Sequence, residues 1–228
     1  MKNANLRRRH NLGYLIAIIA TVSLIAILLL PQSGQLITPG PMNTGHELLV
    51  CESCHRNAKG TLRQQLQANV QYFLGNKESL VDIGYRPVGN SDCLACHSRK
   101  NERHPVFRFY EPRFKKARES IQPHLCISCH LEHKGVRVTA ETNFCSNCHE
   151  DLEIKKDALQ VTHKQLVKQK KWKSCLGCHD YHGNHIMKVA NDSANSHSDK
   201  VMTEYFNGAD SPYSTKKRYK AKETRDDE

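Results

Sequence analysis

The chain has 228 residues, a formal net charge of +11 and a pI near 9.2. A basic excess of this size ordinarily indicates a nucleic acid or an anionic surface as the partner. Four of the positive charges, Lys2 and Arg7 to Arg9, precede an apolar segment, which leaves +7 for the rest of the chain. The charge therefore does not establish a nucleic-acid role.

The N-terminal segment is predicted to cross a membrane. Residues 12–30 form an uncharged run rich in Leu, Ile, Ala and Val. As a helix this run would span roughly 28 Å, close to the ~30 Å of a bilayer core. No Ala-x-Ala pattern follows before Pro31, so we expect an uncleaved anchor rather than a signal peptide. The preceding basic residues predict that residues 1–11 are cytoplasmic and that the remainder is exported, beginning with a linker at residues 31–45.

All the cysteines of the chain, ten in number, fall in five Cys-x-x-Cys-His motifs. This spacing is typical of c-type haem attachment, in which both thiols bond the porphyrin and the histidine binds the iron. Zinc sites, disulfides and thioredoxin-like pairs also use Cys-x-x-Cys, but none requires the histidine that follows every time here. We therefore predict five covalent haem c groups. The attachment residues are Cys51, Cys54, Cys93, Cys96, Cys126, Cys129, Cys145, Cys148, Cys175 and Cys178, and the proximal iron ligands are His55, His97, His130, His149 and His179.

Covalent haem attachment takes place outside the cytoplasmic membrane. The motifs and the apolar segment together predict a single-pass protein of a bacterial inner membrane with its haem domain in the periplasm. Ten haem propionates would offset most of the remaining positive charge. Residues 99–118 carry eight basic against two acidic side chains, and we expect these to pair with propionates, with docking to an acidic partner as the alternative.

The predicted fold is mostly α-helical with extensive loops, wrapped around the haems and preceded by one transmembrane helix. The haem domain, residues 46–190, leaves little room for an ordinary core. Residues 61–73 have apolar side chains at helical spacing, and this helix is expected to pack on haem 1 or haem 2; a membrane-surface or quinol-pocket role is the alternative. Residues 79–88 suggest a short extended piece, and the polar residues 191–228 a disordered tail.

A second histidine on each iron would favour electron transfer over substrate binding, because it closes the remaining coordination position. Six histidines are candidates for the five positions: His46, His104, His133, His163, His182 and His185. His133 and His182 each follow a proximal histidine by three residues, too near to reach the opposite face of the same porphyrin. Each is therefore expected to ligate a neighbouring haem. We expect His124 to support a ligand and His197, in the tail, to be idle.

The repeated Cys-x-x-Cys-His units, the Cys-His-x-x-His variants and the few residues per haem make residues 46–185 resemble the class III multihaem cytochromes and their periplasmic relatives. The resemblance implies low-potential bis-histidine haems and a role in anaerobic respiration. The anchored layout is also similar to that of the membrane-bound multihaem quinol dehydrogenases, which usually have four motifs. In haem number the chain is similar to the soluble pentahaem carrier of formate-dependent nitrite reduction.

The sequence thus predicts an electron carrier rather than an enzyme. It would accept electrons from the quinol pool, directly or through a membrane donor subunit, and pass them to a periplasmic redox protein. Quinol dehydrogenase activity stays open at this point. The alternative is a terminal reductase of a small nitrogen or sulfur oxide, which would need one haem with an open distal face.

Overall fold

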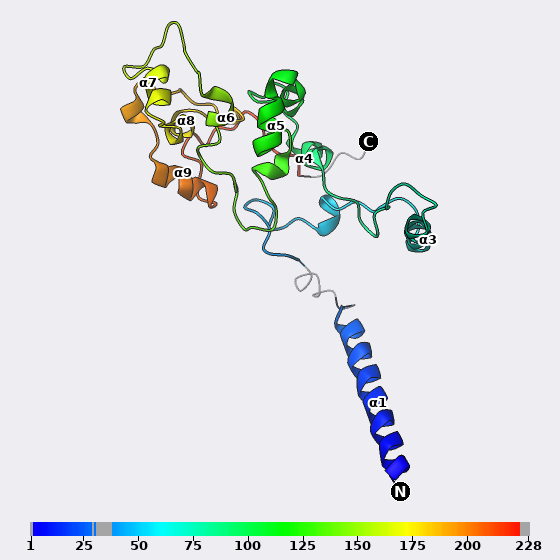
Figure 1. Cartoon of the computed structure of the whole chain (residues 1–228). Helices are drawn as coiled ribbons and strands as arrows, with labels where there is room; N and C mark the ends of the chain where they lie inside the picture. The colour runs from blue at the N-terminus through cyan, green and yellow to red at the C-terminus, as the bar shows by residue number, and fades with distance from the viewer. Residues whose placement is uncertain (1, 29, 31–37, 224–228) are drawn as a thin grey trace. The chain divides into compact units, whose positions relative to one another are not determined.

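The computed structural model describes residues 2–28, 30 and 38–223 and divides the chain into two units, residues 1–41 and 42–228 (Figure 1). The first unit contains helix α1 (Lys2–Leu28). Its stretch Arg7–Ile27 has a mean hydropathy of 1.9 and no buried residues. Within the described residues it is the one helix long and apolar enough to cross a membrane, a property that anchors and signal sequences share. Most of the predicted linker, residues 31–37, lies outside the described residues.

The second unit consists of short helices joined by loops (Figure 1). Its elements are η2 (Cys51–Ser53), α3 (Leu62–Phe73), α4 (Asn90–His97), η3 (Val106–Tyr110), η4 (Pro112–Phe114), α5 (Lys115–Ile121), η5 (Cys126–Ser128), α6 (Ser146–His149), α7 (His163–Lys168), α8 (Lys173–Cys178), η6 (Ser193–Asn195) and α9 (Asp199–Phe206). The described residues contain no strand, only two isolated bridges, so the mostly helical prediction is confirmed. The extended piece expected at residues 79–88 amounts to the single bridge between Asn57 and Tyr85.

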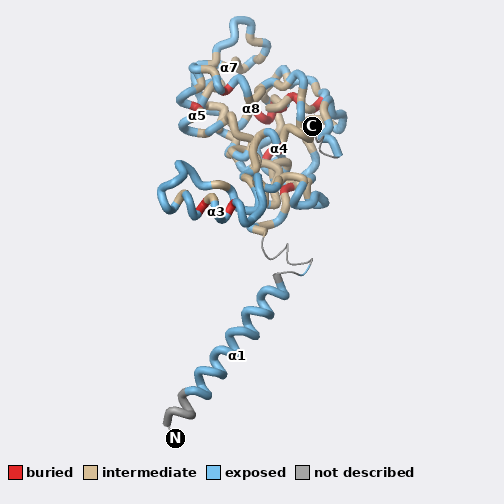
Figure 2. Tube along the Cα trace, turned by 90° about the vertical axis from the view of Figure 1, so that its right-hand side faces the viewer, coloured by how far each residue is buried: buried red, intermediate tan, exposed pale blue. Residues whose placement is uncertain are grey.

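The apolar core of the second unit is small, as the short buried stretches in Figure 2 show. In the described part of the chain, the buried apolar side chains are Phe109, Ala117, Leu176, Cys178 and Met202. A domain of this length ordinarily buries far more apolar surface. Protein atoms alone therefore supply little of the interior, and hydrogen bonds and ring contacts position many of the functional side chains.

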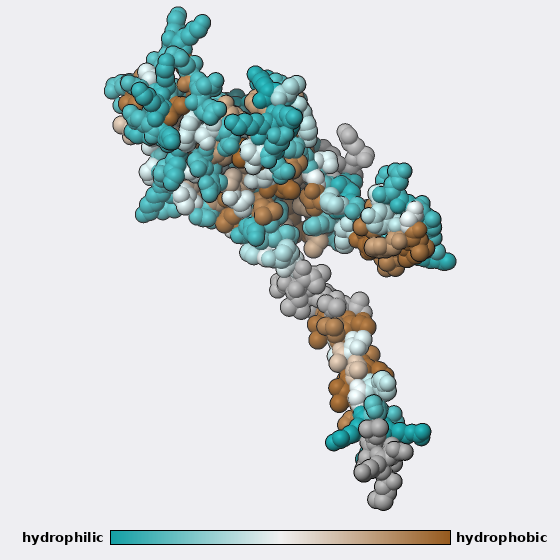
Figure 3. All heavy atoms as spheres, viewed as in Figure 1, coloured by the Kyte–Doolittle hydropathy of each residue, from teal (hydrophilic) through white to brown (hydrophobic). Residues whose placement is uncertain are grey.

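Helix α3 is the predicted helix of residues 61–73, and it begins with a capping box between Thr61 and Gln64. Its buried side chains are polar. Gln65 donates to backbone carbonyls of residues 58–60 and accepts from Gly84 N, while Asn69 bonds both backbone groups of Val81. The apolar stripe, formed by Leu62, Leu66, Val70 and Phe73, has 48–77% exposure among the protein atoms, and its packing on a haem stays a prediction. Figure 3 shows the resulting hydrophobic patch over α3.

The C-terminal segment differs from the disordered tail expected from its composition. Residues 191–223 are described and include α9, whose Met202 is 1% exposed and which packs on α8. The Tyr213 hydroxyl donates to the carbonyl oxygens of Leu176 and His179 at 2.7 and 3.2 Å. The composition of this segment is polar on average, but the segment contains a few apolar and aromatic residues. These residues attach it to the fifth motif.

Candidate functional site

The five motifs share a local geometry. We number them sites 1 to 5 in chain order. Each motif forms a helical turn. In sites 1, 3, 4 and 5 the backbone N–H of the histidine donates to the carbonyl of the first cysteine at 2.8–3.1 Å, and in site 2 the motif forms the end of α4. A turn of this kind brings residues four apart to the same side of the helix. The two thiols and the imidazole of each motif are thereby grouped for a single ligand.

Every motif imidazole has one imidazole from outside the motifs as a close neighbour. The ring pairs are His55 with His133, His97 with His46, His130 with His182, His149 with His104 and His179 with His163. Their centroids are 5.9–6.4 Å apart. These five partners are five of the six predicted distal ligands.

The ring spacing fits a metal between the two imidazoles. An imidazole nitrogen lies about 2 Å from a bound transition metal, and its ring centre about 1 Å further, so two rings on opposite sides of one metal are about 6 Å apart. Direct stacking of two rings would bring them closer, as for His104 and Tyr181 at 4.2 Å. The residues present at each site, two thiols and two imidazoles with ring centres about 6 Å apart, therefore fit a covalently attached, bis-histidine haem.

The other histidines of the second unit are not paired with a motif imidazole. His185, the sixth candidate, is buried and has Nδ1 2.9 Å from Asp180 Oδ2 and its ring beside Tyr213. His124 has its ring against Tyr110, with Nδ1 buried and without a hydrogen-bond partner. His197 has its ring beside Tyr213 and donates its backbone N–H to Gly177 O.

The thiols come together in pairs from different motifs. Cys93 hydrogen-bonds Cys126, and Cys145 hydrogen-bonds Cys175, which lowers the pKa of Cys175 to about 7. The cysteines form no disulfide, and no three or more His, Cys, Asp or Glu side chains of the described residues converge as a metal cluster.

Residues 44–150 match the family model for cytochrome c3. The matched segment contains the first four motifs, and the fifth motif follows it. No curated protein and no solved structure matches the chain. The family match supports a multihaem c-type cytochrome, with haem c as its covalent cofactor and electron transfer as its activity.

Burial favours the neutral form of three motif imidazoles. Burial lowers the pKa of His97 to about 4 and also lowers the pKa values of His130 and His179. Only a neutral imidazole has a lone pair for a metal. These three side chains therefore require no deprotonation to bind iron at neutral pH.

Four of the five partner imidazoles are oriented through their Nδ1 atoms. His46 Nδ1 lies 2.5 Å from Glu132 Oε1, and His163 Nδ1 lies 2.9 Å from Asp157 Oδ2. His182 Nδ1 bonds Glu102 in the same way, whereas His104 Nδ1 donates to the backbone oxygen of Tyr181 at 2.9 Å. A proton held on Nδ1 leaves Nε2 with its lone pair for a metal.

Sequence reasoning missed the three carboxylates because it considered iron ligands alone. Glu132 carried a local signal, since it lies between two candidate ligands in Cys-His-Leu-Glu-His. Glu102 and Asp157 had no such local signal. Glu102 is 80 residues from His182 in sequence, and Asp157 contacts His163 because of the turn that precedes α7. Burial works to raise the pKa of Glu132, but the hydrogen bonds from His46 and Asn43 and the nearby imidazoles together lower the pKa of this carboxyl below its ordinary value.

The basic segment 99–118 divides into two parts. Arg99 bonds Asn184 and lies 3.7 Å from Glu102, and Arg118 donates to the carbonyls of Phe109 and Glu111. Arg108 and Arg113 are exposed beside Glu111. Arg99 thus joins the segment after the second motif to the segment after the fifth, Arg118 holds the turns before α5, and the exposed pair remains on the surface.

Proposed function

We propose that this chain is a membrane-tethered pentahaem electron carrier of the periplasm. It takes electrons from the quinol pool or a membrane donor subunit and passes them to a periplasmic redox protein. The observation that carries the proposal is the set of five imidazole pairs at 5.9–6.4 Å, one for each motif. When bound, each haem iron supplies a centre that accepts and releases one electron.

Three imidazoles follow one motif in the chain and pair with the imidazole of another motif. His133 follows motif 3 and pairs with site 1, His182 follows motif 5 and pairs with site 3, and His104 follows motif 2 and pairs with site 4. Because each of these residues is only a few positions from its own motif, the two sites it joins must be neighbours.

The thiol pairs add two further connections. The contact between Cys93 and Cys126 brings sites 2 and 3 together, and that between Cys145 and Cys175 brings sites 4 and 5 together. With the shared imidazoles, every site is connected to at least one other, and all five belong to one network. This arrangement supports conduction through the protein rather than five separate redox centres.

The pairing also weighs against a terminal reductase. A reductase needs an iron with one position free for its substrate, whereas each motif imidazole here has a second imidazole opposite it. The exposed apolar stripe of α3 is the candidate contact for a quinone. The donor is therefore tested directly: rapid reduction of the purified chain by a menaquinol analogue alone would establish direct quinol oxidation, and no reduction would require a separate donor subunit.

The first prediction concerns the cofactor. The mature protein should exceed the mass of its unmodified polypeptide by about 3 kDa, the mass of five haems, and should retain them in acid–acetone because thioethers hold them. Its ferric spectrum should be wholly low-spin, with little carbon monoxide bound after reduction. Intact mass spectrometry and absorption spectra test this, and a colourless product or a large high-spin fraction would contradict the proposal.

The second prediction concerns the anchor. Replacing residues 1–30 with a cleavable signal should release a soluble five-haem protein with unchanged spectra, because the span and the haem-bearing residues belong to different units. Electron transfer from membranes should fall, since a tether raises the effective concentration at the donor. Fractionation and haem staining measure the first effect and membrane-driven reduction the second. Failure of the truncated chain to load haem would show that residues 1–30 do more than anchor it.

A further inference from the structure

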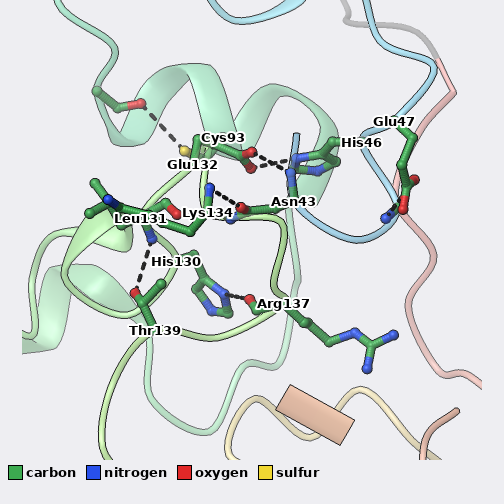
Figure 4. A network of polar contacts seen from close by, with 12 residues as sticks. Asn43, His46, Glu47, Cys93, His130, Leu131, Glu132, Lys134, Arg137 and Thr139 are labelled. Atoms are coloured by element: carbon green, nitrogen blue, oxygen red, sulfur yellow. Dashed lines mark hydrogen bonds and ion pairs between the residues drawn. The ribbon is translucent and has the colours of Figure 1, made fainter. Parts of the chain in front are cut away.

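Glu132 contacts a part of the chain that is far away in sequence. It lies between His130 of the third motif and His133, yet its Oε1 is bonded to His46 Nδ1, and its Oε2 accepts the backbone N–H of Asn43 at 3.3 Å. Figure 4 shows the carboxylate pointing across to the imidazole. Both oxygens are therefore used to hold residues 43–46.

The buried Asn43 fixes the approach of the two segments. Its amide Nδ2 donates to Leu131 O at 3.0 Å, and its Oδ1 accepts the backbone N–H of Lys134 at 3.1 Å (Figure 4). Asn43 thus bonds the backbone on either side of Glu132. The carboxylate is held in place by these contacts, and His46 is oriented by the carboxylate.

We propose that Glu132 is the positioning residue of His46 at haem 2, and that it tunes that haem's reduction potential. The inference rests on the proposed ligation of haem 2 by His46 and His97. An ionised carboxylate that accepts from Nδ1 makes the imidazole a stronger electron donor through Nε2. A stronger donor stabilises ferric over ferrous iron, so Glu132 lowers the potential of haem 2.

This assignment makes one short segment common to three haems. In Cys129-His130-Leu131-Glu132-His133, His130 belongs to site 3, His133 pairs with site 1 and Glu132 holds the imidazole of site 2. A shift of this segment would alter all three sites together. The segment therefore couples haems 1, 2 and 3 mechanically as well as by proximity.

The same device recurs at two other sites. Glu102 holds His182 at site 3, and Asp157 holds His163 at site 5. Glu102 also lies 3.7 Å from Arg99, so its carboxylate interacts with a guanidinium as well as with His182. At site 4 the acceptor for His104 is a neutral backbone carbonyl. Carboxylate anchoring therefore distinguishes haems 2, 3 and 5 from haem 4, and Glu132 is its clearest test.

The test is Glu132→Gln in the full chain, purified in detergent. Glutamine keeps the shape and an acceptor oxygen but removes the charge, so five haems should load and stay low-spin. In a spectroelectrochemical titration, one of the five reduction steps should shift to higher potential. The electron paramagnetic resonance signal of one low-spin ferric haem should change with it.

Glu47→Gln is the matched control. Glu47 is adjacent to His46 and exposed, and its carboxylate accepts the backbone N–H of Gly45 at 2.8 Å, so the variant makes the same charge change without removing a hydrogen bond to an imidazole. It should leave all five steps in place. Equal shifts in both variants would overturn the inference in favour of a general charge effect.

The outcomes separate the inference from the proposed function. A wild-type protein without five low-spin haems would refute the proposed function, whereas a normal wild type with no shift in Glu132→Gln would refute only the role of Glu132. If Glu132→Gln does not accumulate, Asp157→Asn tests the same anchoring at haem 5. It should raise a different single step, and an unchanged titration there would overturn the inference.

Discussion

Replacing His133 with alanine is expected to open the iron of haem 1, which is attached at Cys51 and Cys54, and to leave haem 3 low-spin. The His133 ring lies 6.4 Å from that of His55 at an interplanar angle of 26°. His133 also has a positive φ of 61°, in the left-handed region, directly after the third motif. The variant should show high-spin ferric iron in about one fifth of its haem and bind carbon monoxide at one ferrous haem.

The identity of the opened haem can be tested by removing it. In a Cys51→Ala, Cys54→Ala background, which lacks attachment site 1, His133→Ala should add no high-spin signal. A signal that persists there would place His133 on another iron. His185→Ala is the control, because His185 is buried but has Asp180 and Tyr213 as neighbours, and it should stay wholly low-spin.

Replacing Met202 with alanine is expected to destabilise the haem-bearing unit by about 2–5 kcal/mol, the usual cost of truncating a buried methionine. Met202 is 1% exposed in α9, and α9 packs on α8, which contains both cysteines of the fifth motif. The loss should be strongest around haem 5. Guanidinium denaturation followed by circular dichroism and by the haem absorption band measures it.

Val201→Ala provides a matched control on the same helix, since Val201 is 37% exposed and should change stability by less than about 1 kcal/mol. A disordered C-terminal segment would make both variants neutral. Equal, negligible effects would therefore contradict the packed segment and restore the interpretation drawn from composition.

The sequence by itself determined the attachment chemistry. Each Cys-x-x-Cys-His motif is complete within five residues, and one helical turn groups its thiols and imidazole, as the bond from His179 N to Cys175 O illustrates. Local spacing also predicted α3, because helical periodicity depends only on neighbouring residues. The spacing of three residues between His130 and His133 likewise predicts, without any structure, that the two do not share a porphyrin.

Tertiary structure decided everything that depends on distant partners. Composition offered six imidazoles for five positions, and only the chain path shows that His46 pairs with His97 while His185 pairs with Asp180. The carboxylate that orients His46 is 86 residues away in sequence, so no local pattern could assign it. The prediction for the C-terminal segment was wrong for a related reason. Its average composition is that of a disordered chain. Its packing depends instead on single side chains such as Met202, which are buried only when the fold brings α8 and α9 together.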